Sequence, residues 1–176
     1  MQSFKIVALA VGAGVAYGIL QDQVTARVCV EYFTIGHPRI VATESPTVLG
    51  LVWGVVATWW VGLILGIPLA LCARLGGRPK LSAAQLRRPI LVLLAVMAVL
   101  ALTAGITGYI AAKRGAVRLL EPLASRVPRE KHAVFLADLW THLTAYGAGF
   151  LGGLGLCGWI CWKRRSPSNA RSFTHP

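Results

Sequence analysis

Charge is scarce in this sequence of 176 residues: only 14% of them are Asp, Glu, Lys or Arg, and six are acidic. A soluble globular domain typically carries about 25% charged residues, and a disordered chain carries few apolar ones. Here 56% of the residues are hydrophobic, and the mean hydropathy is +0.64. The composition excludes both classes and indicates an integral membrane protein.

Motifs that carry catalysis are also missing. The sequence contains no P-loop, nucleophile elbow, nucleotide-binding glycine fingerprint or HExxH. We therefore assign no catalytic residue, and an enzyme is the least supported class of function. No cofactor is expected. A haem would need axial ligands from two helices, but His132 and His142 lie on one predicted span, about 15 Å apart, and no other span carries a histidine.

Four long apolar stretches alternate with short basic segments. A helix of about 20 residues crosses the hydrocarbon core, and membrane strands would alternate instead of being continuously apolar. We predict an all-α integral membrane four-helix bundle in residues 1–165, with spans at about 4–22, 46–74, 86–113 and 132–163. Lys5 and the small residues near Ala16 leave open a cleaved secretory signal in place of the first span. The polar residues 166–176 are predicted to form a disordered cytoplasmic tail.

The basic residues predict the orientation. With the N-terminus in the cytoplasm, ten of the 18 Lys and Arg fall inside and eight outside. Both termini are therefore predicted to be cytoplasmic. Since the cations lie between apolar runs and not on one face, we expect anionic lipid headgroups as their partners and no nucleic acid.

Small residues recur at every fourth position in the second and fourth spans. Helices associate in lipid where small side chains let their backbones approach closely. The rows predict that these two spans cross each other; alternatively, one row mediates a homo-oligomer or contact with a membrane partner protein. The rows are Gly50, Gly54, Thr58, Gly62, Gly66 and Ala70, and Thr141, Ala145, Gly149, Gly153, Cys157 and Cys161.

Proline marks two points in the second span. Pro46 follows Ser45, a pattern typical of a helix start at which the serine caps the first turn. Pro68 lies inside the span and predicts a kink there.

Ionisable residues inside or beside the spans give the candidate site. Asp138 and His142 are four residues apart, on one face of the fourth span, where a charge is costly unless it is paired or faces water. One hypothesis is an outward-facing ligand or metal site formed by Glu31, His37, Asp138 and His142, its metal unknown. The favoured interpretation is structural: Asp138 and His142 pair with each other and with Arg27 or Arg39, and so hold the first loop against the bundle.

The four cysteines divide into Cys29 on the outer side and three toward the cytoplasmic end. A thiol oxidoreductase needs a pair of outer cysteines, which Cys29 alone does not supply. Cys157 and Cys161, with Cys72 nearby, could bind a soft metal. Small packing residues of the fourth span are the commoner role.

The stretch from Asp22 to Pro38 and the segment Ala137-Asp138-Leu139-Trp140-Thr141-His142 resemble sequences of an uncharacterised bacterial inner-membrane protein family. The resemblance implies a bacterial inner (plasma) membrane location and brings no activity with it.

Together these features favour a small multi-pass membrane protein that acts as a structural or interaction component without catalysis. The alternative is a small transporter, or a membrane protein that binds a ligand or metal, which uses the outward-facing cluster of histidines and carboxylates.

Overall fold

The computed structural model describes residues 1–165, and the predicted tail at 166–176 lies outside the described residues. The described chain is all-helical and holds no strand, so the predicted fold class is confirmed. Its elements are α1 (Gln2–Val28), α2 (Val30–Thr34), α3 (Pro46–Val56), α4 (Trp59–Arg74), α5 (Ala83–Lys113), α6 (Leu123–Arg126), the short 3-10 helix η1 (Arg129–Lys131) and α7 (His132–Lys163).

Four segments are long and apolar enough to cross a membrane: α1, the pair α3 and α4, α5, and α7. The first continues to Val28 instead of ending near residue 22, so Asp22 lies within a helix and not in a loop. The third span begins at Ala83, slightly earlier than the predicted residue 86. Ser82 caps this helix and forms a capping box with Gln85 in its first turn.

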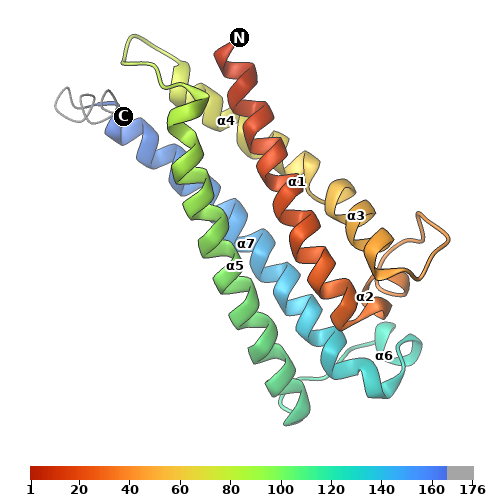
Figure 1. Cartoon of the computed structure of the whole chain (residues 1–176). Helices are drawn as coiled ribbons and strands as arrows, with labels where there is room; N and C mark the ends of the chain where they lie inside the picture. The colour runs from red at the N-terminus through yellow and green to blue at the C-terminus, as the bar shows by residue number, and fades with distance from the viewer. Residues whose placement is uncertain (166–176) are drawn as a thin grey trace.

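The long helices run side by side, and both ends of the described chain lie at one end of the bundle (Figure 1). We call this the terminal end; it also carries the turn between α4 and α5. The opposite end, which we call the loop end, carries α2 and α6. A cluster of buried apolar side chains closes the loop end, in which Phe33 of α2 and Phe135 of α7 meet Leu119 and Val127 of the α5–α7 connection.

The small residues of the second span face α1. A Cβ atom at Gly54 would lie 2.5 Å from the Cα of Ile19, and one at Gly62 would lie 2.6 Å from the Cα of Val11. The expected crossing of the second and fourth spans through their small residues is therefore wrong. Such a row shows that a close backbone neighbour exists, but it does not identify that neighbour.

The small residues of α7 meet side chains of two other helices. A Cβ at Gly149 would lie 2.9 Å from Met97 of α5, and one at Gly153 would lie 3.0 Å from Leu65 of α4. The second and fourth spans thus touch at Leu65 and Gly153. There a long side chain of α4 enters the space that a glycine of α7 leaves, so α4 packs directly against α7.

The second span is interrupted at Ala57 and Thr58, and not at Pro68. Helix α4 continues through Pro68, whereas α3 ends at Val56 and α4 starts only at Trp59. Pro46 starts α3 as predicted, but the Ser45 side chain makes no capping hydrogen bond. The Ala57 carbonyl accepts a hydrogen bond from the Tyr146 hydroxyl of α7 at 3.3 Å, so the interruption serves as a contact point between two spans.

Gly54→Ala is expected to lower the free energy of unfolding by about 2 kcal/mol, since the added methyl group collides with backbone and cannot be relieved by rotating a side chain. The matched control is Gly155→Ala in α7, where a Cβ would have nothing within 4 Å. Unfolding of the purified protein by sodium dodecyl sulfate in mixed micelles measures the difference. Equal stability of the two variants would contradict the close α1–α3 contact.

Arg164 fastens the terminal end. Its side chain is only 5% exposed, and its guanidinium group donates to backbone oxygens in the turn that follows α4. Nε bonds to Pro79 at 2.7 Å and Nη2 to Leu75 at 3.1 Å and Arg78 at 3.2 Å, while Nη1 bonds to the Cys72 carbonyl. These carbonyls include ones left free where α4 ends. One cation directly after α7 therefore holds the end of α4 and the following turn.

Candidate functional site

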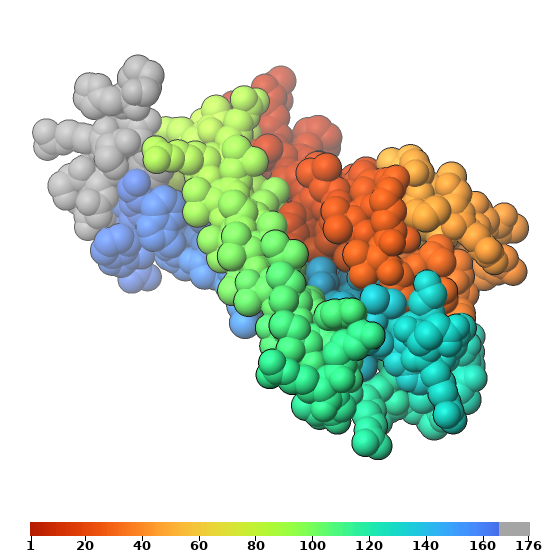
Figure 2. Space-filling view, turned by 60° about the horizontal axis from the view of Figure 1, so that its bottom comes forward, coloured from red at the N-terminus to blue at the C-terminus, as the bar shows by residue number. Residues whose placement is uncertain are grey.

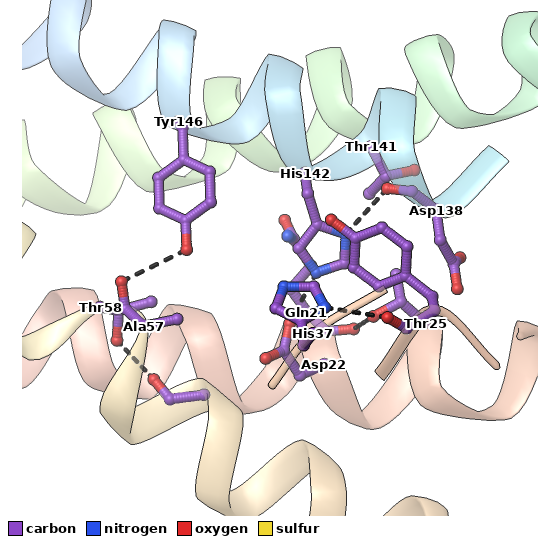
Figure 3. Close-up of polar contacts among 12 residues, drawn as sticks. Gln21, Asp22, Thr25, His37, Ala57, Thr58, Asp138, Thr141, His142 and Tyr146 are labelled. Atoms are coloured by element: carbon purple, nitrogen blue, oxygen red, sulfur yellow. Dashed lines mark hydrogen bonds and ion pairs between the residues drawn. The ribbon is translucent and has the colours of Figure 1, made fainter. Parts of the chain in front are cut away.

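A buried pair of ionisable side chains joins the first and fourth spans. Asp22 of α1 and His142 of α7 point toward one another, with Asp138 one helical turn away on α7 (Figure 3). His142 Nε2 lies 3.0 Å from Asp22 Oδ1, and His142 Nδ1 lies 2.8 Å from the carbonyl oxygen of Asp138. Asp22 and His142 are 4% and 7% exposed.

The geometry fixes how many protons the Asp22–His142 pair holds. A carbonyl oxygen can only accept, so Nδ1 of His142 carries a proton and donates it to Asp138. The 3.0 Å contact on the other side of the ring then needs one further proton between Nε2 and Oδ1. Whichever atom carries it, the pair is neutral overall. A neutral hydrogen-bonded pair is the form in which two ionisable groups can lie inside a membrane span.

The expected pairing of the Asp138 and His142 side chains is wrong. His142 uses the backbone of Asp138, and its side-chain partner is Asp22. Neither arginine proposed as an additional partner fills that role. Arg27 bonds to the Gln23 side chain at 2.8 Å and to the Thr47 hydroxyl at 2.8 Å, and Arg39 is exposed. Thr47 lies in the first turn of the second span, so Arg27 links α1 to α3.

His37 belongs to an aromatic cluster beside the ion pair. Its ring centroid lies 4.8 Å from that of Tyr32 and 4.6 Å from that of Trp53, and the Tyr32 ring also stacks on His142 at 4.6 Å. Its Nδ1 donates to the Tyr32 carbonyl at 2.8 Å. Burial lowers the pKa of His37 below its ordinary value of 6.5, so the ring is uncharged at neutral pH.

Glu31, the fourth of the predicted ligands, bonds to other residues and not to the predicted site. Its Oε1 pairs with Lys131 Nζ at 3.5 Å, and its Oε2 accepts from the Cys29 thiol at 3.4 Å. Within residues 1–165, no three His, Cys, Asp or Glu side chains are grouped so that they could hold a metal ion. Of the four sequence-predicted residues, His142 and His37 both contact the Tyr32 ring, Glu31 lies on α2, and the Asp138 side chain bonds to none of the other three.

An apolar groove of about 620 Å³ lies between α1, α5 and α7. Its rim consists of apolar side chains exposed on the outer surface of the bundle, among them Leu20 and Val24 of α1 and Leu102 and Ile106 of α5. Figure 2 shows α1 and α5 on this side, with α7 behind them. The floor is α7, through Ala137, Asp138 and Thr141. A space with such a rim opens toward lipid.

Two residues that line the groove each carry a buried polar atom without a partner. Among the described residues, the buried side-chain oxygens and nitrogens that lack a hydrogen bond are Asp138 Oδ2 and Gln21 Oε1. Asp138 is 2% exposed. The nearby hydroxyls are already used, because Thr25 donates to the Gln21 carbonyl at 3.2 Å and Thr141 to the Ala137 carbonyl at 2.9 Å. Buried acceptors without donors are costly, and here both belong to residues that line one groove.

The cysteines are distributed as the sequence suggested. The Cys72 thiol of α4 lies beside Cys157 and Cys161 of α7 near the terminal end. Cys29 lies apart from them, buried in the loop-end cluster. Burial is the largest of the effects that raise the pKa of Cys29 to about 12. A thiol that remains protonated is a poor nucleophile and a poor metal ligand.

Cys29 is expected to resist maleimide in the folded protein, reacting slower by on the order of a hundredfold than an exposed thiol. The test uses a variant in which Cys72, Cys157 and Cys161 are alanine. The control adds Cys29→Ala and Ala42→Cys, which places the thiol in the exposed part of the same loop. Labelling in detergent at slightly alkaline pH, before and after denaturation, gives the two rates. Fast labelling of folded Cys29 would contradict its burial.

Comparison with known protein families, curated proteins and solved structures finds no match to this chain. The site therefore rests on its own geometry. Sequence reasoning found Asp138 and His142 because they interrupt an apolar span, but it missed Asp22 as the partner of His142. It also missed Gln21, because a glutamine at the predicted end of a span is unremarkable.

Proposed function

We propose that this protein is a bacterial inner-membrane protein with both termini in the cytoplasm, and that it binds a single-chain amphiphile from the bilayer in the groove between α1, α5 and α7. The supporting observation is that the two unpartnered buried oxygens, on Asp138 and Gln21, both belong to residues lining this apolar groove. An amphiphile supplies hydrogen-bond donors to those oxygens and an apolar chain to the rest. Since α1 contributes one wall and Asp22, we infer that the first span is retained and not cleaved.

The depth of Asp138 suits such a ligand. The 32 residues of α7 extend about 48 Å, which exceeds the roughly 30 Å hydrocarbon core by about 9 Å at each end. Asp138 is six residues into the helix, or about 9 Å from its start. The carboxyl group therefore lies near the boundary between headgroups and hydrocarbon, where the polar head of an amphiphile resides.

Filling the groove tests this proposal. Ala98 and Ala95 are both exposed on α5, but only Ala98 lines the groove. In lipid nanodiscs, a dodecyl amphiphile (dodecylamine, dodecanol or dodecanoate) is expected to raise the unfolding temperature of the wild type saturably, because it binds the folded state alone. Ala98→Phe removes this shift, whereas Ala95→Phe keeps it.

Two outcomes contradict the proposal: no saturable shift with any of the three compounds, or equal shifts in the two phenylalanine variants. Either outcome would favour the other expected class of function, a structural or interaction component of the membrane. Asp138 would then bind no ligand.

A further inference from the structure

The groups around Asp138 include no permanent cation. Among the described residues, neither ion pair involves Asp138; the two pairs are Lys131–Glu31 and His142–Asp22. The ionisable groups whose charges act on it or lie beside it come from α1, from the segment after it, and from α5 and α7. Asp22, Cys29 and Tyr32 act on Asp138 through their charges, and His142 bonds to its carbonyl oxygen. Tyr17 of α1 and Tyr109 of α5 line the same groove, while His37 and Tyr146 face Asp22.

The two carboxyl groups of this cluster are in different situations. Asp22 is matched by His142, and their shared proton makes the pair neutral. Asp138 has no such partner, and its Oδ2 is buried without a hydrogen bond. A carboxylate inside a span is retained only where something neutralises it. Either a proton or a cation in the groove can do so at Asp138, but not both at once.

We propose that Asp138 exchanges a proton for the ammonium group of a cationic amphiphile. This inference rests on the proposed function and names its substrate class. With the groove empty, the proton is held on the Asp138 carboxyl group. When an alkylammonium enters, the O–H bond breaks, the proton passes to water, and the carboxylate pairs with the ammonium. The charge of the site is the same before and after the exchange.

The unpartnered oxygen of Asp138 favours a primary ammonium. An –NH₃⁺ group has three hydrogen-bond donors, one of which can serve Asp138 Oδ2 while the positive charge pairs with the carboxylate. A quaternary ammonium has none and would satisfy the charge alone. The site is therefore expected to prefer dodecylamine over dodecyltrimethylammonium, and both over dodecanol.

Calorimetry measures the exchange directly. Dodecylamine is titrated into the nanodisc-bound protein at neutral pH, in phosphate and in Tris, which differ in their heats of ionisation. An alkylamine remains protonated at this pH, as lysine does, so any proton released comes from the protein. We expect the release of about one proton for each dodecylamine bound, since the bound state holds one proton fewer. Dodecanol should bind without release.

Asp138→Asn removes the carboxyl charge while keeping the shape of the groove, so it distinguishes the contribution of the charge to binding from that of the cavity. The variant should bind dodecylamine roughly tenfold or more weakly, since an amide lacks the charge that strengthens the hydrogen bond, and without proton release. Its affinity for dodecanol should be unchanged, which shows that the groove is intact. The control is Glu130→Gln, an exposed carboxyl outside the groove, which should behave as the wild type does.

Each other outcome has a distinct meaning. Binding of dodecylamine by the wild type without proton release overturns the exchange and leaves the proposed function standing. Proton release that persists in Asp138→Asn shows that another group, such as the Asp22–His142 pair, supplies the proton, and it also overturns the assignment. If neither dodecylamine nor dodecanol binds the wild type, the proposed function fails, and the exchange fails with it.

Discussion

Arg164→Ala is expected to lower the free energy of unfolding by about 3 kcal/mol, because one side chain supplies charged donors to carbonyls at the end of α4 and in the following turn. Arg164→Lys should recover little of the loss, since an ammonium group is a point charge and cannot span carbonyls from residue 72 to residue 79. Arg164 is also only 5% exposed, so its truncation removes packing as well as hydrogen bonds.

The neighbouring Arg165→Ala is the matched control, because the Arg165 side chain is exposed. Detergent-induced unfolding of the three variants gives the comparison, and proteolysis between α4 and α5 reports whether the turn has loosened. If Arg164→Ala and Arg165→Ala were equally stable, Arg164 would be only one more of the basic residues that favour the cytoplasmic side.

The second large effect is expected at the ion pair. Asp22→Ala and His142→Ala should each lower the free energy of unfolding by about 3–5 kcal/mol, because each leaves a buried ionisable group without its partner. Asp22→Asn combined with His142→Gln should recover part of this, since two uncharged amides can still bond across the gap. The wild type, the two single alanine variants and the double alanine variant form a double-mutant cycle that isolates the coupling between the two side chains.

Asp138→Asn serves as a comparison for that cycle, since the Asp138 side chain bonds to neither member of the pair. It should change stability little, while the pair variants change it strongly. Additive losses at Asp22 and His142 would mean that the two residues do not interact, and the 3.0 Å contact would then carry no energy.

The four spans could be read from the sequence because length and apolarity alone decide whether a helix crosses a membrane. The end of the first span could not, because Asp22 and Arg27 look like loop residues when each is judged by its own charge. Inside the structure the charge of Asp22 is matched by His142, and Arg27 bonds to Gln23 and Thr47. A charged residue therefore marks the end of a span only where no other side chain pairs with it.

The arrangement of the spans was harder to predict. The period of four small residues correctly marks faces that approach other helices, yet the face bearing Gly54 and Gly62 meets α1 and not α7. Spacing along one helix contains no information about which helix lies opposite. The first span carries a small row of its own, Ala10, Gly14 and Gly18, and Gly14 and Gly18 lie against Thr58, Gly62 and Gly54 of the second span.

The candidate site was visible only in part for the same reason. Asp138 and His142 stand out against an apolar span, whereas the partner of His142 lies 120 residues earlier in the chain. Arg164 was invisible as an anchor, because its partners are backbone carbonyls, which every residue has. Contacts between side chains leave traces in a sequence, but a cation that binds backbone oxygens leaves none.

The rim formed by Leu20, Val24, Leu102 and Ile106 determines how occupancy of the groove should be described. Its entrance faces acyl chains and not water, so any guest is already dissolved in the bilayer when it arrives. The relevant variable is then its mole fraction among the lipids, and diluting the sample with buffer leaves that fraction unchanged. Titrations should accordingly be made against total lipid, with the ratio of guest to phospholipid on the horizontal axis.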